Sequence, residues 1–518
     1  MKKKLLTLTA AVLLATGALA GCSGSGEPAA DPGPGASAAP AGPVKFSISM
    51  RTLANQHVEG SPNINEDKWV KKLEELTNTD LDIRLVPHKD FEQKMTQMFA
   101  INDVPDVVQS YSPVDKAMAG SVEAGIFLPL DDLLKQYGQN LLKKIPKAAW
   151  DEVTVGGKIM SVPEWLEVSN RRGTYIRMDL LEQTGLPVPK SVEEYLNVMR
   201  AFKKLGVENP YGGRENFSYS DAFFGAYDVN PAQFEKQGDQ IIPKYANIER
   251  MTKALETYKT MFDEGLISKE FATTSGTTWQ NNIFAGKTGI WSMNVASFET
   301  TVAKIKENVP AAKVAIIPSP TGLDGKGGNA LYGSMVRSYF INKKAADPAA
   351  IIKFFDWMVS DEAEKFFTFG VENETYKVEG GAIKYERPTA AAAINEEAFR
   401  SDWLWMVKDT TYNKGLTSMT EGGKQLIDYI QNVIVKEGRD GYRFYPPLQS
   451  YTDYPDAASG GFLNSVLDKY LFGIIYGKEP LSSWPKAIEE WKSKGGNAII
   501  KDATDRVKSG DGFRTPRM

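Results

Sequence analysis

The hydrophobic pattern after residue 44 constrains the fold of this chain more than any other feature, because it changes repeatedly between two periods. Residues 45–50 have apolar side chains at every second position, which predicts a β-strand. A helical stripe follows, and then a second alternating run, a second helical stripe and a short apolar strand, at 69–76, 81–85, 91–99 and 105–108. Strands that alternate with helices predict an α/β fold, with a largely parallel sheet and helices on both of its faces.

Later segments carry further helix signals. Ser191 and Glu194 have the spacing of a capping box at the start of a helix. Asp347 and Pro348 fit the N-cap and the first turn of another helix. A regular apolar stripe at 248–262 predicts a third. We assign the apolar residues of these helices to the core.

The length of the chain predicts more than one core. About 475 of the 518 residues follow residue 43, whereas single cores stop growing near 250–300 residues. Two lobes are therefore expected. The formal net charge is −4 and Lys and Arg are spread along the chain. No basic patch indicates a nucleic-acid partner.

The first residues have the pattern of a targeting segment. Lys2, Lys3 and Lys4 precede an apolar run at 5–20 that ends in small residues, which predicts a signal peptide over residues 1–21. The run is too short to be a membrane span, which takes about 20 apolar residues. The sequence Leu-Ala-Gly-Cys at 19–22 resembles the bacterial lipobox, in which the cysteine thiol receives a diacylglyceryl group. Cys22 is therefore the expected lipid-attachment site.

Cysteine use and the composition of the next segment agree with an anchored protein. Cys22 is the only cysteine, which excludes internal disulfides and thiolate metal clusters. An ordinary secretory signal with an incidental cysteine is the alternative. Residues 23–43 contain only Ser, Gly, Ala, Pro, Glu and Asp. We expect residues 22–43 to form a lipidated Cys and a flexible linker, which spans roughly 25 Å and holds the folded body near the membrane.

Enzyme motifs are poorly represented. With two histidines, His57 and His88, the chain has no His-x-x-x-His spacing for a zinc-hydrolase helix. The sequence at 286–288 resembles the end of a phosphate-binding loop, but Asn281 stands where that loop needs its first glycine. Neither a Gly-x-Ser-x-Gly elbow nor a calcium loop of EF-hand type occurs. We therefore predict no catalytic residue, no metal site and no cofactor.

Several phrases occur in an order that resembles a known family. They include Asp-Val-Pro-Asp-Val-Val at 103–108, and others lie at 125–133, 157–163, 175–181, 185–195 and 284–287. In this order and spacing the chain resembles extracellular solute-binding protein family 1 of ABC importers. The phrases at 369–372 and 491–496 are similar to the large lipoprotein subgroup of Paenibacillus-like Gram-positive bacteria. Members of that subgroup are often associated with import of plant or algal oligosaccharides.

The resemblance implies a two-lobed, periplasmic-binding-protein-like fold of type II, with the ligand in a cleft between the lobes. It implies a lipid-anchored binding component on the extracellular face of a Gram-positive-type cell membrane. This component captures a carbohydrate and delivers it to the permease subunits of an ABC importer, and it is expected to be a monomer. The expected lobes are 44–163 with 318–370, and 164–317 with 371–518, joined by crossing segments near 162–169 and 318–322.

One departure from the family concerns calcium. Relatives often carry an Asp-Pro-Asn-Gly-Asn-Gly loop after the helix that here is expected to end near Leu205. Residues 206–213 read Gly-Val-Glu-Asn-Pro-Tyr-Gly-Gly instead. The acidic ligands that calcium needs are absent, so the family's calcium site is not expected in this chain.

The candidate ligand contacts are polar and aromatic residues at strand ends and in the first crossing segment. Sugar C–H faces pack on flat apolar rings, and hydroxyls suit planar side chains with two hydrogen-bonding atoms. Sheets of α/β proteins bind ligands beyond the carboxyl ends of their strands. The expected ligand-binding residues are Arg51, Ser110, Tyr111, Glu164, Trp165, Asn170, Arg171, Trp291, Asn294 and Trp403.

Alternatives accompany these assignments. Each tryptophan could equally belong to a lobe core, although at least one of Trp403 and Trp405 is expected near the ligand. Arg171 or Arg172 would suit the carboxylate of an acidic sugar, or would form an exposed salt bridge of little consequence. A receptor for a peptide or another non-sugar solute, a surface polysaccharide-degrading enzyme and a partner of a membrane sensor kinase remain open as functions.

Overall fold

The computed structural model describes residues 42–113, 115–118, 120–444, 447–458, 462–510 and 513–514. The expected signal peptide, Cys22 and most of the expected linker lie outside these residues. Among the described residues no helix is both long enough and apolar enough to cross a membrane. Residues from Pro43 onward form one unit, which contains two β-sheets of four or more strands.

The first large sheet, which defines lobe 1, has five strands in the order β2-β1-β3-β13-β6. Strand β1 pairs in parallel with β2 and β3, whereas β13 runs antiparallel to both β3 and β6. The mixed direction arises because β13 enters this sheet from the other lobe. The strands are β1 (Val44–Arg51), β2 (Thr79–Val86), β3 (Val107–Ser110), β6 (Val162–Trp165) and β13 (Met335–Ile341).

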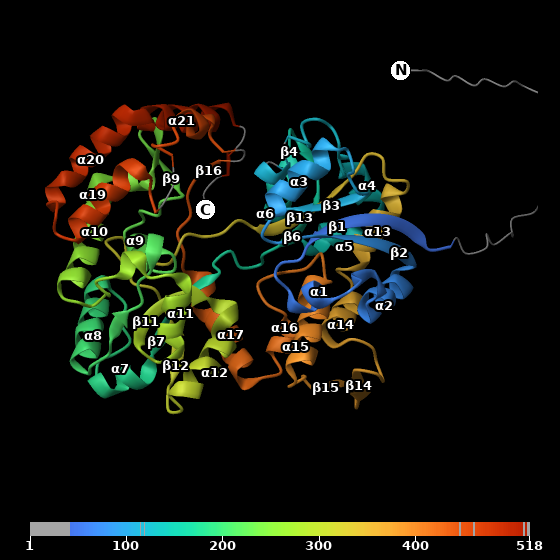
Figure 1. Ribbon diagram of the computed structural model, residues 1–518, viewed down its shortest axis with the longest axis horizontal. Helices are drawn as coiled ribbons and strands as arrows, with labels where there is room; N and C mark the ends of the chain where they lie inside the picture. Colours follow the sequence, from blue (N-terminus) through green and yellow to red (C-terminus); the bar gives the residue numbers. More distant parts are fainter. Residues whose placement is uncertain are drawn as a thin grey trace, which may run out of the picture. The chain divides into compact units, whose positions relative to one another are not determined.

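Helices cover both faces of this sheet, as the alternating pattern predicts (Figure 1). On one face α2 (Lys68–Thr77), α13 (Pro348–Trp357) and α14 (Asp361–Phe369) bury a cluster that includes Ile48 and Phe355. On the other face α3 (Phe91–Ala100) packs on Val108 and Phe340. The neighbouring β3 residues Val107 and Val108 therefore enter different cores, and β1 is also buried along most of its length.

The second large sheet, which defines lobe 2, has four strands in the order β12-β7-β11-β8. Strand β7 runs antiparallel to its neighbours β11 and β12, and β8 runs parallel to β11. The strands are β7 (Arg172–Arg177), β8 (Asn209–Tyr211), β11 (Thr288–Asn294) and β12 (Val314–Ile317). This sheet also lies between two hydrophobic clusters.

A group of helices completes lobe 2. One cluster joins the sheet to α8 (Val192–Lys204), α10 (Ile248–Asp263) and the C-terminal helices, and in it Trp484 and Trp491 are fully buried. The other cluster contains side chains from α11 (Gly276–Phe284), α12 (Phe298–Asn308) and α17 (Glu421–Asn432). The C-terminal helices are α19 (Ser465–Ile475), α20 (Trp484–Trp491) and α21 (Asn497–Ser509), drawn at the upper left of Figure 1.

The structure confirms the helix starts expected from the sequence. The Ser191 hydroxyl oxygen accepts the Glu194 N–H at 3.3 Å, and the Glu194 carboxylate accepts the Ser191 N–H at 2.9 Å. This is the reciprocal capping box of α8. Asp347 caps α13 by accepting the Ala350 N–H at 2.9 Å.

Three crossing segments join the two lobes. Residues 166–171 connect β6 to β7, residues 318–334 connect β12 to β13, and residues 409–420 lead from the first lobe into α17. The crossings expected from the sequence lie near 162–169 and 318–322, and none was expected at 409–420. Phe399 and Val407 pack in the same cluster as β1, so we propose that lobe 1 extends to Lys408 rather than to residue 370.

Arg439 holds the second crossing segment to lobe 2. Its guanidinium donates to both oxygens of Asp324, at 2.6 and 2.9 Å, and to the Lys326 carbonyl at 2.8 Å. It also donates to the carbonyls of Gly225 and Ala226 at 2.7 and 2.9 Å. Arg439 lowers the pKa of Asp324 to about 2. A Cβ at Gly225 would lie 2.0 Å from the Gly328 carbonyl oxygen, so only glycine permits this close approach.

Replacing Arg439 with Met is expected to lower the free energy of unfolding by about 3 kcal/mol, because three carbonyls and Asp324 lose their donors. Urea unfolding followed by circular dichroism measures this loss. Arg84→Met is the control, since Arg84 is 44% exposed and its ion pairs are worth less than about 1 kcal/mol. Equal losses in the two variants would show that Arg439 has no special structural role.

Candidate functional site

The strand directions place one edge of each sheet beside the crossing segments. In lobe 1 the carboxyl ends of β1, β3 and β6 and the amino end of β13 share an edge. Arg51, Ser110 and Trp165 lie there. In lobe 2 the amino end of β7 lies at the same edge as the carboxyl ends of β8, β11 and β12, which brings in Arg172 and Asn294. The candidate site is therefore built from these two edges and the segments between them.

Glu164 is the buried centre of the lobe 1 edge. Its side chain is 1% exposed, and Arg337 donates to its two oxygens at 2.6 and 2.7 Å. Lys408 lies 3.3 Å from the same carboxylate and 2.9 Å from an oxygen of Asp402. Because both oxygens of Glu164 are occupied by these cations, we withdraw Glu164 as a direct ligand contact. Its partner Arg337 was missed by the sequence analysis.

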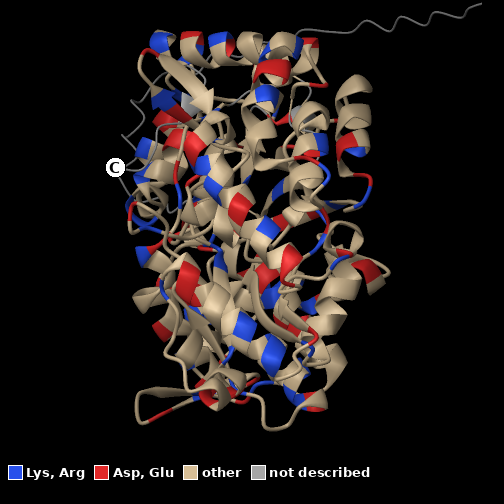
Figure 2. Ribbon diagram, turned by 90° about the vertical axis from the view of Figure 1, so that its left-hand side faces the viewer, with Lys and Arg blue, Asp and Glu red and all other residues tan. Residues whose placement is uncertain are grey.

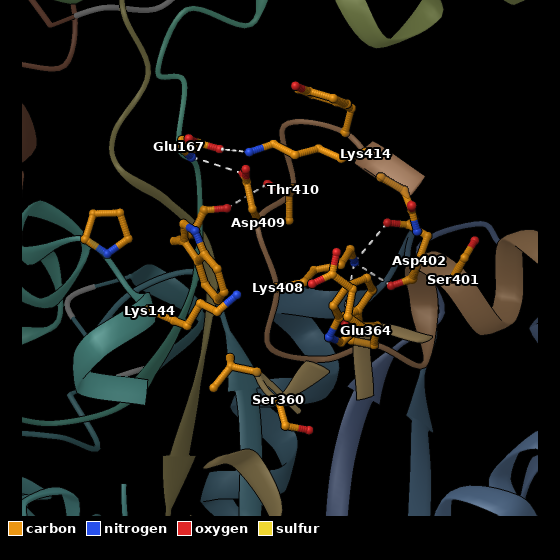
Figure 3. A pocket seen from close by; sticks show the side chains of 16 residues that line it. Lys144, Glu167, Ser360, Glu364, Ser401, Asp402, Lys408, Asp409, Thr410 and Lys414 are labelled. Atoms are coloured by element: carbon orange, nitrogen blue, oxygen red, sulfur yellow. Dashed lines mark hydrogen bonds and ion pairs between the residues drawn. The ribbon is translucent and has the colours of Figure 1, made fainter. Parts of the chain in front are cut away.

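A pocket of about 470 Å³ lies along the first and third crossing segments (Figure 3). Its aromatic wall consists of Trp165, Trp405 and Tyr412. The Trp405 ring stacks on Phe367 with centroids 5.3 Å apart and planes 10° from parallel, and its Nε1 donates to the Met358 carbonyl. The ring is thus held rigidly. The charged residues of the pocket are Lys144, Glu167, Glu364, Asp402, Lys408, Asp409 and Lys414.

Hydrogen bonds across the pocket join the first crossing segment to the third. The Glu167 N–H donates to Asp409 at 3.0 Å, and Lys414 lies 2.7 Å from the Glu167 carboxylate. The Thr410 N–H donates to the Trp165 carbonyl at 2.9 Å. Burial raises the pKa of Asp409, whereas the bond from Lys414 lowers that of Glu167. The two segments therefore form one polar wall of the pocket.

A second pocket, of about 530 Å³, opens beyond β1 and β3. Arg51 and Tyr111 line it, together with Phe91. The Arg51 guanidinium carbon lies 4.7 Å from the Phe91 ring centroid and 4.8 Å from that of Tyr111. Ser110 is 2% exposed and does not line this pocket. We therefore retain Arg51 and Tyr111 as candidates and withdraw Ser110.

The end of the first crossing segment has two roles. Asn170 is buried, and its amide donates to the carbonyls of Ile434 and Glu437 at 3.2 and 3.3 Å, so it ties the segment to lobe 2. We withdraw Asn170 as a ligand contact for this reason. Arg171 is half-buried and its guanidinium lies 5.5 Å from the ring of Tyr332, which is 38% exposed. Arg171 stays a candidate.

The two remaining predicted tryptophans belong to the core. Trp291 is 0% exposed and stacks on Tyr175 with centroids 5.6 Å apart. Trp403 is 3% exposed, and its Nε1 donates to the Arg51 carbonyl at 2.9 Å. We withdraw both as ligand contacts, although Trp403 fixes the backbone of Arg51. Asn294 is half-buried at the end of β11, and its carbonyl accepts the Tyr175 hydroxyl.

The site offers aromatic rings and fixed charges to a ligand. Among the residues that the structure describes, no group of three or more His, Cys, Asp or Glu side chains could hold a metal ion. Lys and Arg are interspersed with Asp and Glu on the side of the molecule that Figure 2 shows. Sequence analysis missed Tyr332, Tyr412 and Arg337 because they lie in loops or strands without a motif, and only the fold brings them to the site.

The comparisons with known proteins agree on one family. A family model described as bacterial extracellular solute-binding protein matches residues 61–365. The polygalacturonan/rhamnogalacturonan-binding protein YtcQ of Bacillus subtilis (strain 168) is 25% identical over 522 residues, which is 96% of this chain and 97% of that protein. Lipoprotein LipO of the same organism is 24% identical over 475 residues, covering 87% of this chain and 91% of LipO.

A solved structure supports the fold. It is an HMO-binding, ABC-transporter-associated solute-binding protein from Bifidobacterium longum infantis ATCC 15697. The TM-score is 0.69 at 14% sequence identity, and the match covers 90% of this chain and 98% of that one. The fold class expected from the sequence, a two-lobed type II binding-protein fold, is confirmed.

Glu437 fixes the start of the second crossing segment. The Ser319 N–H and hydroxyl donate to its two carboxylate oxygens at 2.7 and 2.8 Å. Burial raises the pKa of Glu437 to about 7. The folded state therefore binds the Glu437 proton more tightly than the unfolded chain does.

The unfolded chain releases this proton near pH ~4.3, so the free energy of unfolding is expected to fall as pH rises from there to about 7 and then to level off. Glu437→Gln should remove up to about 3 kcal/mol of this fall, because an amide accepts the Ser319 N–H without charge. Urea unfolding at pH 5, 6, 7 and 8 measures it. Asp132→Asn, at a fully exposed side chain, should leave the pH dependence unchanged.

Proposed function

Because this chain belongs to the family of bacterial extracellular solute-binding proteins, we propose that it is the lipid-anchored binding component of an ABC importer. It captures an oligosaccharide outside the cell and presents it to the permease. The observation that carries this proposal is the pocket of Trp165, Trp405 and Tyr412 on the crossing segments. Rings that face a polar wall suit a solute with apolar C–H faces and a rim of hydroxyls.

The polar groups of the pocket support a saccharide over an apolar solute. Glu167, Asp402 and Asp409 offer carboxylate oxygens, and Lys408 and Lys414 offer ammonium donors. Such groups form charge-assisted hydrogen bonds with hydroxyls, and these bonds are stronger than neutral ones. YtcQ is named for binding polygalacturonan and rhamnogalacturonan, and the Bifidobacterium protein is named for HMO binding. Membership of a family of binding proteins supports a binding role without catalysis.

Attachment to the membrane through Cys22 is the second part of the proposal. The lipobox-like residues 19–22 support it, and LipO is named a lipoprotein. A lipid on Cys22 keeps the folded body next to its permease, which raises the local concentration of the receptor. Residues 23–43 would then act as the tether.

The anchor is tested by Cys22→Ser in a Gram-positive host. Serine lacks the thiol that carries the lipid, so we expect the protein to move from the membrane fraction to the culture medium. Immunoblots of the two fractions measure this, and Ser23→Ala is the control that should stay with the membrane. Retention of the serine variant in membranes would contradict lipid attachment at this residue.

Binding is tested by thermal unfolding of the purified full-length protein against neutral and acidic oligosaccharides, monosaccharides and peptides. A ligand at 100 times its Kd should stabilise the protein by about 2.7 kcal/mol. Trp405→Leu is expected to weaken saccharide binding roughly tenfold, which corresponds to about 1.4 kcal/mol. Isothermal titration calorimetry measures the affinity.

Trp357→Leu is the matched control, because Trp357 is also half-buried but lies outside the pocket and bonds to Glu362. It should leave saccharide affinity unchanged. A shift with peptides alone would replace the saccharide by a peptide as the solute. Degradation of a polysaccharide during the assay would indicate an enzyme instead.

A further inference from the structure

Three arginines alternate with three aromatic rings at the lobe 2 edge. We call this set the arginine–aromatic row. The guanidinium of Arg172 lies 5.8 Å from the Tyr332 ring and 5.4 Å from the Tyr219 ring, and that of Arg171 lies 5.5 Å from Tyr332. Arg214 lies 5.9 Å from Tyr219 and 5.5 Å from Trp279. The row consists of Arg171, Tyr332, Arg172, Tyr219, Arg214 and Trp279.

The row is assembled from segments that are distant in the sequence. Arg171 and Arg172 lie where the first crossing segment enters β7, Tyr332 lies in the second crossing segment, and Trp279 lies in α11. A Cβ at residue 276 would lie 2.6 Å from the Arg214 guanidinium, so glycine at this position leaves room for it. The sheet edge and a crossing segment thus position a row of arginines and rings that is buried at Trp279 and more exposed at Tyr332.

The arginines of the row differ in how far their charge is neutralised. Arg172 donates to Asp221 at 2.7 Å. Arg214 has a longer ion pair, 3.6 Å, with Glu215. Arg171 has neither a hydrogen bond nor an ion pair from its side chain to any residue that the structure describes. A guanidinium carries five N–H donors, so those of Arg171 are unused.

Arg51 repeats this arrangement at the lobe 1 edge. It packs on Phe91 and on Tyr111, which is 37% exposed. Within the described part of the chain no carboxylate lies within 4.0 Å of its guanidinium, and its one side-chain hydrogen bond, to the His88 carbonyl, is 3.4 Å long. Arg51 in lobe 1 and Arg171 at the lobe 2 edge therefore both lack an acidic partner among the described residues, and each packs on a tyrosine that is partly exposed.

Several other arginines of this protein are paired with carboxylates, whereas the buried Arg400 donates to the carbonyls of Phe367 and Thr368. Arg177 donates to the two oxygens of Asp179 at 2.8 and 2.6 Å, and Arg337 holds Glu164 in the same two-bonded way. Arg439 does so with Asp324. Such pairs satisfy the planar geometry that guanidinium and carboxylate share. Arg51 and Arg171 have the same planar set of donors but no carboxylate partner among the described residues.

Electrostatic effects link the two arginines to one site. The pKa of Arg51 is lowered by its partial burial and then by the positive charge of Arg337. The pKa of Asp402 is lowered first by Lys408 and also by Arg337 and Arg171. Arg337 thus influences both Arg51 and Asp402, and Arg171 influences Asp402.

We propose that the solute is an acidic oligosaccharide, whose uronate carboxylates are bound by Arg51 from lobe 1 and by Arg171 from lobe 2. This inference rests on the proposed function. Tyr111 and Tyr332 supply exposed ring surface beside each guanidinium, which suits a sugar ring that carries a carboxylate. A neutral oligosaccharide would leave both guanidiniums without a counter-charge.

The test compares sugars that differ only in charge. Purified full-length protein is titrated calorimetrically with oligogalacturonates, oligoguluronates and oligoglucuronates of three to six units, each as free acid and as methyl ester. The free acid of one series is expected to bind at least tenfold more tightly than its ester. This preference should shrink as salt is raised from 0.05 to 0.5 M, because salt screens partly exposed charges.

Variants assign the effect to the two arginines. Arg51→Gln and Arg171→Gln should each weaken binding of the acid roughly tenfold or more and leave binding of the ester unchanged. Arg51→Lys and Arg171→Lys should recover part of the affinity, because lysine keeps the charge but not the planar pair of donors. Arg84→Gln is the control, since Arg84 is exposed and lies on β2 away from the crossing segments.

The outcomes distinguish failure of the acidic ligand from failure of the proposed function. Ester binding as tight as acid binding, or tight binding of neutral oligosaccharides only, overturns the acidic ligand and leaves an oligosaccharide importer in place. If both Gln variants bind the free-acid oligosaccharide as tightly as the unchanged protein does, the roles of Arg51 and Arg171 are overturned. Binding of no saccharide while another solute class stabilises the protein overturns the proposed function and this inference together.

Discussion

The buried carboxylate of Glu164 is the interaction on which the rest of the structure depends. Glu164 lies on β6, Arg337 on β13, and Lys408 at the end of the lobe 1 chain. Each of these three residues lies close to the place where one of the crossing segments leaves lobe 1. An unpaired buried carboxylate is very costly, so the three chain segments are fixed together by the need to neutralise one charge. These fixed segments determine where the chain crosses from lobe 1 into lobe 2.

Around this centre the protein uses arginine in two ways. Arg337 is paired with a carboxylate, Arg439 with a carboxylate and three carbonyls, and both act as parts of the scaffold. Arg51 and Arg171 pack on tyrosine rings and keep their donors free of acidic partners. Arginine thus stabilises the scaffold at some positions and is available to bind a ligand at others. The surroundings of each guanidinium, rather than its residue type, distinguish the two roles.

Local features of the fold could be predicted from the sequence, and contacts between distant residues could not. Strand β1, helix α2 and the capping box of α8 follow from period and spacing within a few residues, and all three are confirmed. No local signal in the sequence marks residues 409–420 as a crossing segment, and for the same reason residues 371–408, which we propose to place in lobe 1, were expected in lobe 2. Glu164 and Arg337 are 173 positions apart.

The candidate site shows the same limit of local information. Trp291 and Trp405 are equally hydrophobic, and only the packing buries the first completely while the second lines a pocket. Trp165, Tyr412 and Arg171 lie on or directly next to the crossing segments, whereas Arg51 lies at the end of β1. Any rotation of one lobe against the other must be absorbed by these segments, so displacements are smallest near them and grow with distance. Side chains on the crossing segments would therefore keep their contacts with a bound solute during such a rotation, whereas contacts made far from these segments would form only when the lobes close.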